Sequence, residues 1–290
     1  MPQKIIPLVL KCFDIIPWNL LDLIAQGLAN LFYPFLSRRR KIAMANLNLV
    51  FNERLSSNQK ETILKTNLYY FIRNILEIGK IMNLEPETWL QKWKIKGEEN
   101  LKAAYMKGRG AIIVSAHVGN FPLMVSILAL RGYDIAVVAK VPQRGIGGKA
   151  INLFERRFGL KFIHARENKK AAILCARHLK KGGMLFIQFD QNAPKHKALI
   201  PFFGYRVPVP RSPAVLAQRT GASIIPVFAL CQKGFRHQVV CESEIKIDKL
   251  EIEEILGEIM KVMEKYAFKY PEQWFWWHRR FKGHIDYANL

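Results

Sequence analysis

The sequence predicts an α/β protein in which a mostly parallel central sheet is flanked by helices and preceded by an N-terminal membrane-associated helical segment. Two observations carry this prediction. After residue 110, short apolar runs alternate with stretches of helical periodicity, which is typical of parallel strands joined by crossover helices. Before residue 37 the chain is strongly apolar, and a basic cluster follows at once. We therefore expect two parts, a membrane-associated segment over 1–55 and an α/β domain over 56–290.

The composition supports a folded protein that meets an anionic surface. Half of the 290 residues are hydrophobic, which supplies a substantial core and excludes global disorder. The formal net charge of +22 indicates an anionic partner, either a membrane face or nucleic acid. The four cysteines form no short metal-type pair, so we expect reduced, buried thiols and no metal site.

The N-terminal apolar stretch covers residues 5–36. Charged residues and prolines interrupt it, so no uninterrupted run of ~20 apolar residues exists to form a clean bilayer span. The pattern also fits a cleavable signal peptide poorly. We expect helices that lie in or dip into the membrane interface. A pair of ordinary core helices is the alternative. The basic run at 38–41 favours attachment, because an anionic leaflet attracts each such charge by ~1 kcal/mol.

The remaining elements follow from apolar periodicity and turn residues. A long helix is expected over 56–82, begun by a capping box of Ser56 and Gln59. Residues 200–204 are expected to lie in a loop. Strands are expected at 111–114, 135–139, 161–164, 184–189 and 223–230, with an edge strand within 239–247. Further helices are expected at 97–107, 123–131, 147–158, 169–181, 213–220 and 251–270.

The turn after the first of these strands is the leading site candidate. His117 follows the apolar run, and Asn120 and Pro122 are suited to the N-cap and first turn of the next helix. His117 would then lie at the carboxyl end of a strand, where open α/β sheets place their chemistry. Gly119 would keep the turn tight and leave room for a substrate. A nearby helix N-terminus favours a neutral imidazole that can accept a proton. A structural turn with an incidental histidine is the alternative.

Polar residues also follow the other strands. Lys140 and Arg144 follow the second strand, Arg166 follows the third, and Asp190 and Gln191 follow the fourth. Because the carboxyl ends of parallel strands share one edge, these residues are expected on the same side as the histidine turn. The cations suit a phosphate or an acidic carrier protein. Unremarkable exposed cations and ordinary turn-forming residues are the alternatives.

Three segments carry a family resemblance. They are Ser-Ala-His-Val-Gly-Asn at 115–120, the run at 189–194 with Ile-Pro-Phe-Phe-Gly at 200–204, and Pro-Glu-Gln-Trp-Phe-Trp-Trp-His-Arg-Arg-Phe-Lys at 271–282. In this order and spacing they resemble the lipid A biosynthesis acyltransferases, the lauroyl/myristoyl transferases within the larger lysophospholipid acyltransferase superfamily. The resemblance covers nearly the whole chain. One position departs from it, because the family motif places Asp or Glu five residues after the histidine and this chain has Pro122 there.

The resemblance implies chemistry for the histidine turn. His117 would be the general base that takes the proton of an attacking hydroxyl. Backbone N–H groups near Gly119 and Asn120 would stabilise the oxyanion, and the Asn120 side chain would assist by analogy with the family. With proline at the acidic position, the second imidazole nitrogen needs another partner. Asp190 is the candidate, and a backbone carbonyl is the alternative.

The resemblance also implies substrates and a location. The reaction would move a fatty acyl group from an acyl carrier protein or coenzyme A thioester to a hydroxyl of a glycolipid such as a lipid A precursor, or of a lysolipid. It would need no cofactor and would take place on the cytoplasmic face of the bacterial inner membrane, against anionic lipids. Phe202 and Phe203 would line an acyl-chain slot, and Gln191 and Arg211 would contact substrate.

Two interpretations from other classes remain. A relative that binds lipid or carrier protein without catalysis is supported by Pro122, although the retained His117, Gly119 and Asn120 oppose it. A basic nucleic-acid-binding protein would explain the charge of +22 but not the apolar N-terminal stretch, and the chain carries no recognised nucleic-acid motif. We therefore expect no nucleic-acid partner.

Overall fold

The computed structural model describes residues 13, 15–140, 145–165, 168–193 and 197–290. Its centre is a seven-stranded sheet, counted over these residues, with the order β1-β9-β8-β2-β5-β3-β4. Neighbouring strands are parallel except for the antiparallel pair β8 and β9. The predicted fold class is therefore confirmed. The strands are β1 (Trp93–Lys96), β2 (Ala111–Ser115), β3 (Ile135–Ala139), β4 (Lys161–His164), β5 (Met184–Gln188), β8 (Ser223–Cys231) and β9 (His237–Cys241).

The central strands are apolar throughout because helices cover both faces of the sheet. Every residue of β2 and of β8 is buried, which is the pattern expected of strands with two covered faces. Ile112 and Val114 belong to one apolar cluster with residues of α3, α9, α10 and α11, whereas Ile113 belongs to a second cluster with residues of α6, α7 and α8. These helices are α3 (Ser37–Phe51), α6 (Glu98–Met106), α7 (Phe121–Leu130), α8 (Gly145–Phe158), α9 (Asn168–Lys180), α10 (Ser212–Thr220) and α11 (Ile252–Lys269).

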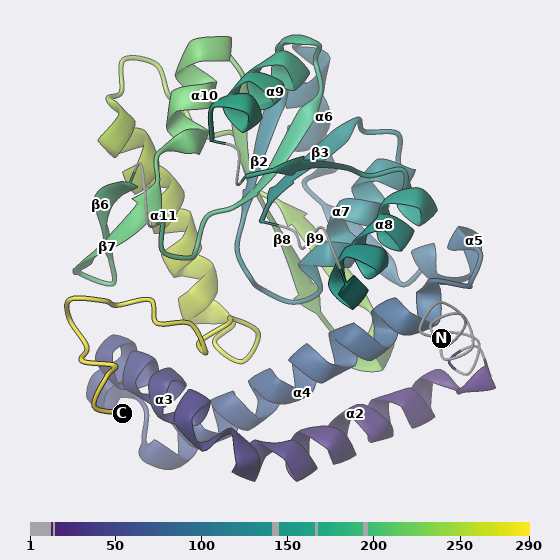
Figure 1. Ribbon diagram of the computed structural model, residues 1–290, viewed down its shortest axis with the longest axis vertical. Helices are drawn as coiled ribbons and strands as arrows, with labels where there is room; N and C mark the ends of the chain where they lie inside the picture. Colours follow the sequence, from purple (N-terminus) through teal and green to yellow (C-terminus); the bar gives the residue numbers. More distant parts are fainter. Residues whose placement is uncertain (1–12, 14, 141–144, 166–167, 194–196) are drawn as a thin grey trace.

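The N-terminal helices lie at one end of the molecule, below the sheet in Figure 1. They are α2 (Trp18–Phe32), the 3₁₀ turns η1 (Tyr33–Leu36) and η2 (Asn52–Arg54), and α4 (Ser57–Ile81); a short helix, α5 (Pro86–Leu90), follows. Helices α2 and α4 contact each other along their length, with α2 outermost. Prolines interrupt helical continuity as predicted, since Pro17 stands at the N-cap of α2 and Pro34 lies in η1. The capping box of Ser56 and Gln59 is confirmed.

The division of the chain at residue 55 stays a prediction. Helix α3, which precedes that boundary, places Ala43, Leu47 and Phe51 in the same apolar core as β2 and α11. The part of the chain before residue 56 therefore contributes to the core of the α/β fold as well as to its outer surface.

One expectation about strands is wrong, and a second, the strand within 239–247, is confirmed only in part. A two-stranded antiparallel hairpin, β6 (Lys197–Phe202) and β7 (Tyr205–Pro210), replaces the loop expected at 200–204. Prolines obscured this hairpin, yet they are tolerated there because a two-stranded ribbon leaves edge N–H positions unpaired. Near 239–247 the strand is β9, and Ile245 forms only an isolated bridge to Ile224. The edge strand β1 was not expected from the sequence.

Candidate active site

His117 and Asp190 form a close pair at the carboxyl edge of the sheet. Asp190 Oδ1 lies 2.7 Å from His117 Nδ1, and Asp190 Oδ2 accepts the backbone N–H of His117 at 3.1 Å. The strand register explains this meeting, because Ser115 of β2 pairs with Gln188 of the parallel strand β5, and each functional residue follows two positions later. The carboxylate beside the imidazole is therefore that of Asp190, which follows the neighbouring strand. The chain has Pro122 at the position where the family motif places the acid.

The electrostatics favour an ionised carboxylate. Burial works to raise the pKa of Asp190, but the charge and hydrogen bonds of His117, together with the Arg280 guanidinium, lower the pKa below its ordinary value. Asp190 is only 5% exposed, so water competes little for its oxygens. An ionised Asp190 holds the proton of the neutral imidazole on Nδ1, and Nε2 is then the nitrogen that can accept a proton.

The other ring nitrogen faces the amide of Gln191. Gln191 Nε2 lies 3.2 Å from His117 Nε2, so the amide donates to the nitrogen that would act as base. The His117 side chain keeps 22% of its surface exposed. A hydroxyl that approaches from this side has to take the position of the Gln191 amide.

Aromatic side chains surround the imidazole and extend to the surface. Phe121 meets the ring of His117 edge-on at 5.1 Å, and the ring of Phe275 lies 6.1 Å away. Phe71 of α4 contacts Phe275 at 6.2 Å and is 49% exposed. A row of contacting aromatic side chains therefore joins the exposed side of α4 to His117.

The C-terminal segment holds the histidine turn from the other side. The Gly119 N–H donates to the Gln273 carbonyl at 3.3 Å, the Phe275 N–H donates to the His117 carbonyl at 3.0 Å, and Val118 and Trp274 form an antiparallel bridge. Two of the segments that carried the family resemblance are thus hydrogen-bonded to each other.

The role expected of Gly119 needs correction. Its φ is +53°, and a Cβ at this position would lie 2.0 Å from the Ala229 carbonyl oxygen of β8. The space that we expected for a substrate is filled by the backbone of the neighbouring strand. The N–H of Gly119 is also taken by Gln273, so it is not a free oxyanion donor. Glycine is required here because the turn is pressed against the sheet.

Asn120 also has a different partner from the one expected. It stands at the N-cap of α7, but its side chain makes no capping hydrogen bond. The side chain is fully buried, and its Nδ2 donates to Glu77 Oε2 of α4 at 2.8 Å. The structure therefore directs the amide at a buried carboxylate, which is a packing and positioning contact.

The two phenylalanines predicted to line an acyl-chain slot, Phe202 and Phe203, lie in different surroundings. Phe202 is buried against Trp274 and Phe281, and it borders a small cavity beside Asp190 and Gln191. Phe203 lies at the hairpin turn, with a φ of +52°, and its N–H donates to the Glu264 carboxylate of α11. Only Phe202 lies next to the His117 region.

The cations predicted to contact substrate lie in different parts of the structure. Lys140 is exposed directly after β3, which stands two strands from β2 in the sheet, so it shares the edge of the site. Arg211 begins α10 and lies 3.5 Å from Glu253, an ion pair between α10 and α11 rather than a contact with the histidine turn. Arg144 and Arg166 lie outside the described residues.

Arg280 and His278 were not expected at the site. Arg280 is buried and donates to Asn192 Oδ1 and to the Pro208 carbonyl, at 2.9 and 2.8 Å. Burial lowers the pKa of Arg280 to about 10, so it stays charged at neutral pH. Burial likewise lowers the pKa of His278 to about 4, and this imidazole is neutral at pH 7. Nothing local in the sequence signals that Arg280 is buried or that His278 is half-buried.

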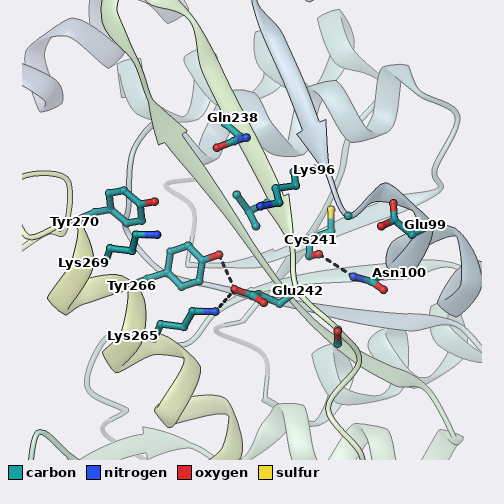
Figure 2. Close-up of a pocket in the computed structure, with 13 residues that line it drawn as sticks. Lys96, Glu99, Asn100, Gln238, Cys241, Glu242, Lys265, Tyr266, Lys269 and Tyr270 are labelled. Carbon is teal, nitrogen blue, oxygen red and sulfur yellow. Dashed lines mark hydrogen bonds and ion pairs between the residues drawn. The ribbon is translucent and has the colours of Figure 1, made fainter.

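A larger cavity lies away from this pair. This cavity has a volume of about 340 Å³ and is bordered by β1, β9, α11 and the start of α6. Figure 2 shows the residues that line it. Its carboxylate Glu242 accepts from Lys265 and from the Tyr266 hydroxyl, each at 2.7 Å. None of its lining residues belongs to the turns that carry His117 and Asp190. The larger cavity therefore does not coincide with the His117–Asp190 pair, which stays the candidate active site.

The fold and the pair point to a class of protein, an α/β protein in which a strand-end histidine contacts a buried aspartate, the residue types that general-base chemistry uses. The family model of the bacterial lipid A biosynthesis acyltransferases matches residues 5–283. The chain belongs to this family and is an acyltransferase, which confirms the resemblance seen in its motifs.

Two relatives from Escherichia coli K12 agree with the family assignment. The lipid A biosynthesis palmitoleoyltransferase of Escherichia coli K12 is 25% identical over 279 residues, covering 92% of this chain and 86% of the relative. The lipid A biosynthesis lauroyltransferase of the same organism is 24% identical over 273 residues, covering 92% and 87%. The solved structure of the 1-acyl-sn-glycerophosphate (LPA) acyltransferase PlsC from Thermotoga maritima is similar at 17% identity and a TM-score of 0.39, covering 85% of this chain and 97% of that one.

Proposed function

We propose that this acyltransferase moves a fatty acyl group from an acyl carrier protein or coenzyme A thioester to a hydroxyl of a lipid A precursor-like glycolipid, with His117 as the general base. The observation that carries the proposal is the 2.7 Å contact between His117 Nδ1 and Asp190 Oδ1, which leaves Nε2 on the partly exposed side. The names of the relatives supply the acceptor class. A lysolipid acceptor is the second candidate.

The proposed reaction uses the pair as one unit. Asp190 holds the Nδ1 proton while Nε2 takes the proton of the acceptor hydroxyl, whose oxygen attacks the thioester carbonyl carbon. A C–O bond forms, and the tetrahedral intermediate collapses by breaking the C–S bond. The imidazolium then returns its proton to the leaving thiolate. Gln191 is the proposed oxyanion donor, because its amide already lies at Nε2 and is released when the hydroxyl binds there.

Membrane attachment is proposed from the two faces of α2. Leu21, Ala25 and Ala29 are buried against the protein, whereas Leu23 and Leu31 on the opposite face are 63% and 58% exposed. The helical stretch Trp18–Arg54 meets the length and composition of a membrane-crossing helix, and 22% of its apolar window is buried. We infer that the exposed face of α2 lies against lipid.

The charge distribution supports the same orientation. The basic run at 38–41 begins α3 directly after the apolar α2 and η1, so cations would meet headgroups where the apolar face meets acyl chains. We propose the cytoplasmic leaflet of the bacterial inner membrane as this surface. The net charge of +22 also suits an acidic carrier protein as donor, with Lys140 at the edge of the site as one contact.

A binding-only relative is the competing function. Its main support was the missing acid at Pro122. The contact of Asp190 with His117 supplies a carboxylate from the next strand, so that support is weaker than the sequence alone suggested.

The test is a transfer assay with the purified, detergent-solubilised protein, acyl carrier protein and coenzyme A donors, and glycolipid and lysolipid acceptors, followed by mass spectrometry of the products. We expect wild-type transfer and a ~10²–10⁴-fold loss in His117→Ala, with membrane binding kept. Wild-type rates in a folded His117→Ala protein would overturn the mechanism. Binding without transfer for every donor and acceptor would favour the binding-only function.

A further inference from the structure

A buried ion pair lies behind the histidine turn and takes no part in the proposed proton transfer. Glu77 of α4 and His237 of β9 are each 1% exposed, and Glu77 Oε1 lies 2.8 Å from His237 Nε2. The ring of Trp93 stacks on the imidazole at 4.0 Å with an interplanar angle of 12°. Burial alone would lower the pKa of His237, but the Glu77 carboxylate and Cys231 raise it to about 9. The His237 imidazole therefore keeps its proton at neutral pH.

The second oxygen of the carboxylate reaches the active-site turn. Glu77 Oε2 accepts the hydrogen bond of Asn120 Nδ2 at 2.8 Å. Asn120 stands three positions after His117 and at the N-cap of α7, so its side chain links the turn to α4. An ionised carboxylate has no proton to donate, and it can accept from both neighbours at once. The imidazolium compensates its charge in a place that water does not reach.

Stability alone is a poor reason for this arrangement. A buried ion pair contributes little compared with apolar side chains of the same volume. Catalytic groups, in contrast, must be held within about 0.5 Å of the productive geometry. The turn from His117 to Asn120 is fixed on its other side by β8, at Gly119, and by the C-terminal segment. Glu77 supplies the contact from α4.

We propose that Glu77 and His237 are positioning residues for acyl transfer, which hold the Asn120 amide and thereby aim His117 Nε2 at the acceptor. The inference rests on the proposed function of His117. It assigns Asn120 to positioning as well, in place of a contact with the reacting atoms.

The first test replaces Glu77 by leucine and uses Arg73→Leu as the matched control. Arg73 lies on the same helix, is equally buried, and donates to the Gln232 carbonyl rather than to the turn. We expect Glu77→Leu to lower kcat about 10–100-fold on the folded fraction, with the KM for the donor little changed, because a displacement of the base by about 1 Å costs that much. Arg73→Leu should lower the melting temperature but keep kcat near wild type.

The second test exchanges the hydrogen-bond donor and the hydrogen-bond acceptor of the contact between Asn120 and Glu77. Asn120→Asp sets two carboxylates against each other and should lower kcat. Adding Glu77→Gln gives the new aspartate an amide donor and leaves an amide oxygen for His237, so the double variant should regain most of the loss. A double variant no better than Asn120→Asp alone would contradict the inference, as would wild-type kcat in Glu77→Leu.

A third measurement does not depend on activity. In protein labelled with [¹⁵N]histidine, the His117 Nδ1 proton that Asp190 holds gives a low-field NMR signal, assigned by its absence in His117→Ala. We expect this signal to broaden or disappear in Glu77→Leu and to persist in Arg73→Leu. Its persistence in Glu77→Leu would overturn the positioning role. If the wild type transfers no acyl group, the proposed function fails, and this signal still decides the positioning role.

Discussion

At the scale of single residues, the proposed mechanism depends most on the contact between His117 and Asp190. Asp190→Asn should lower acyl transfer strongly, because an amide holds the Nδ1 proton less firmly than a carboxylate does. Because residues that act as a unit are not additive, the double variant with His117→Ala should be little slower than His117→Ala alone. The measurement is kcat/KM for the wild type, the two single variants and the double variant. Additive losses would instead assign Asp190 to acceptor binding.

Gly119 gives a second prediction at this scale, on stability. Gly119→Ala combines a positive φ with a Cβ 2.0 Å from the Ala229 oxygen. We expect a loss of roughly 2–5 kcal/mol in the free energy of unfolding, the sum of backbone strain and overpacking. Gly108→Ala is the control, since its φ is +69° but nothing lies within 4 Å of its Cβ position, so only about 1–2 kcal/mol of strain remains. Denaturant titrations that give equal losses would show that the close approach is unimportant.

At the scale of elements, much of the sheet was predictable because its signals are local. β3 and β4 begin and end at the expected residues, since short apolar runs bounded by polar turns define buried parallel strands. The capping box fixes the start of α4 in the same way. Asp190 was identifiable for a related reason, because residues that follow neighbouring parallel strands meet at one edge.

The remainder depends on contacts between distant parts of the chain. β1 is recognisable as a strand only through its pairing with β9, and the prolines of the β6–β7 hairpin oppose a strand assignment locally. The burial of Arg280 and the contact between Asn120 and Glu77 depend on tertiary structure alone. Periodicity carries no information about such partners.

Helix α2 allows a prediction about attachment. Replacing Leu23 and Leu31 by serine should weaken binding to phospholipid vesicles, since each apolar side chain buried in lipid is worth about 1.5–3 kcal/mol. The control is Ile173→Ser on α9, which is 59% exposed but lies at the far end of the molecule from α2 (Figure 1). Vesicle flotation measures the bound fraction. Equal binding by all three proteins would exclude the α2 face as the attachment surface.

The pair between α4 and β9 predicts a pH dependence of stability. His237 has a folded-state pKa of about 9, above its ordinary value of 6.5, because the Glu77 carboxylate and Cys231 outweigh burial. Its contribution, on the order of 3 kcal/mol, is complete below about pH 6.5 and is lost as pH rises through about 9. We expect the melting temperature to fall between these values in the wild type and to fall less in His237→Gln. Parallel curves for the two proteins would contradict this.

At the scale of the whole molecule, the net charge of +22 and the apolar face of α2 should contribute separately to membrane binding. Binding to anionic vesicles should weaken as salt rises, because screening shortens the reach of each charge. Binding to neutral vesicles should be weaker but nearly independent of salt, since only the apolar part remains. Titrations with both vesicle types at several ionic strengths measure the two parts. A salt-independent affinity for anionic vesicles would show that the cations do not face the lipid.

The pairing of the C-terminal segment with the histidine turn has a consequence for synthesis. The segment that contains Gln273, Trp274 and Phe275 leaves the ribosome after every strand of the sheet. The hydrogen bonds that Asn46 of α3 donates to the Trp276 and His278 carbonyls can also form only then. If α2 attaches to the membrane as proposed, a nascent chain presents this helix long before the turn around His117 can be fixed in place. Under the proposed function, anchoring would come first and catalytic competence last, so an unfinished chain at the bilayer would have no assembled site with which to consume acyl donors.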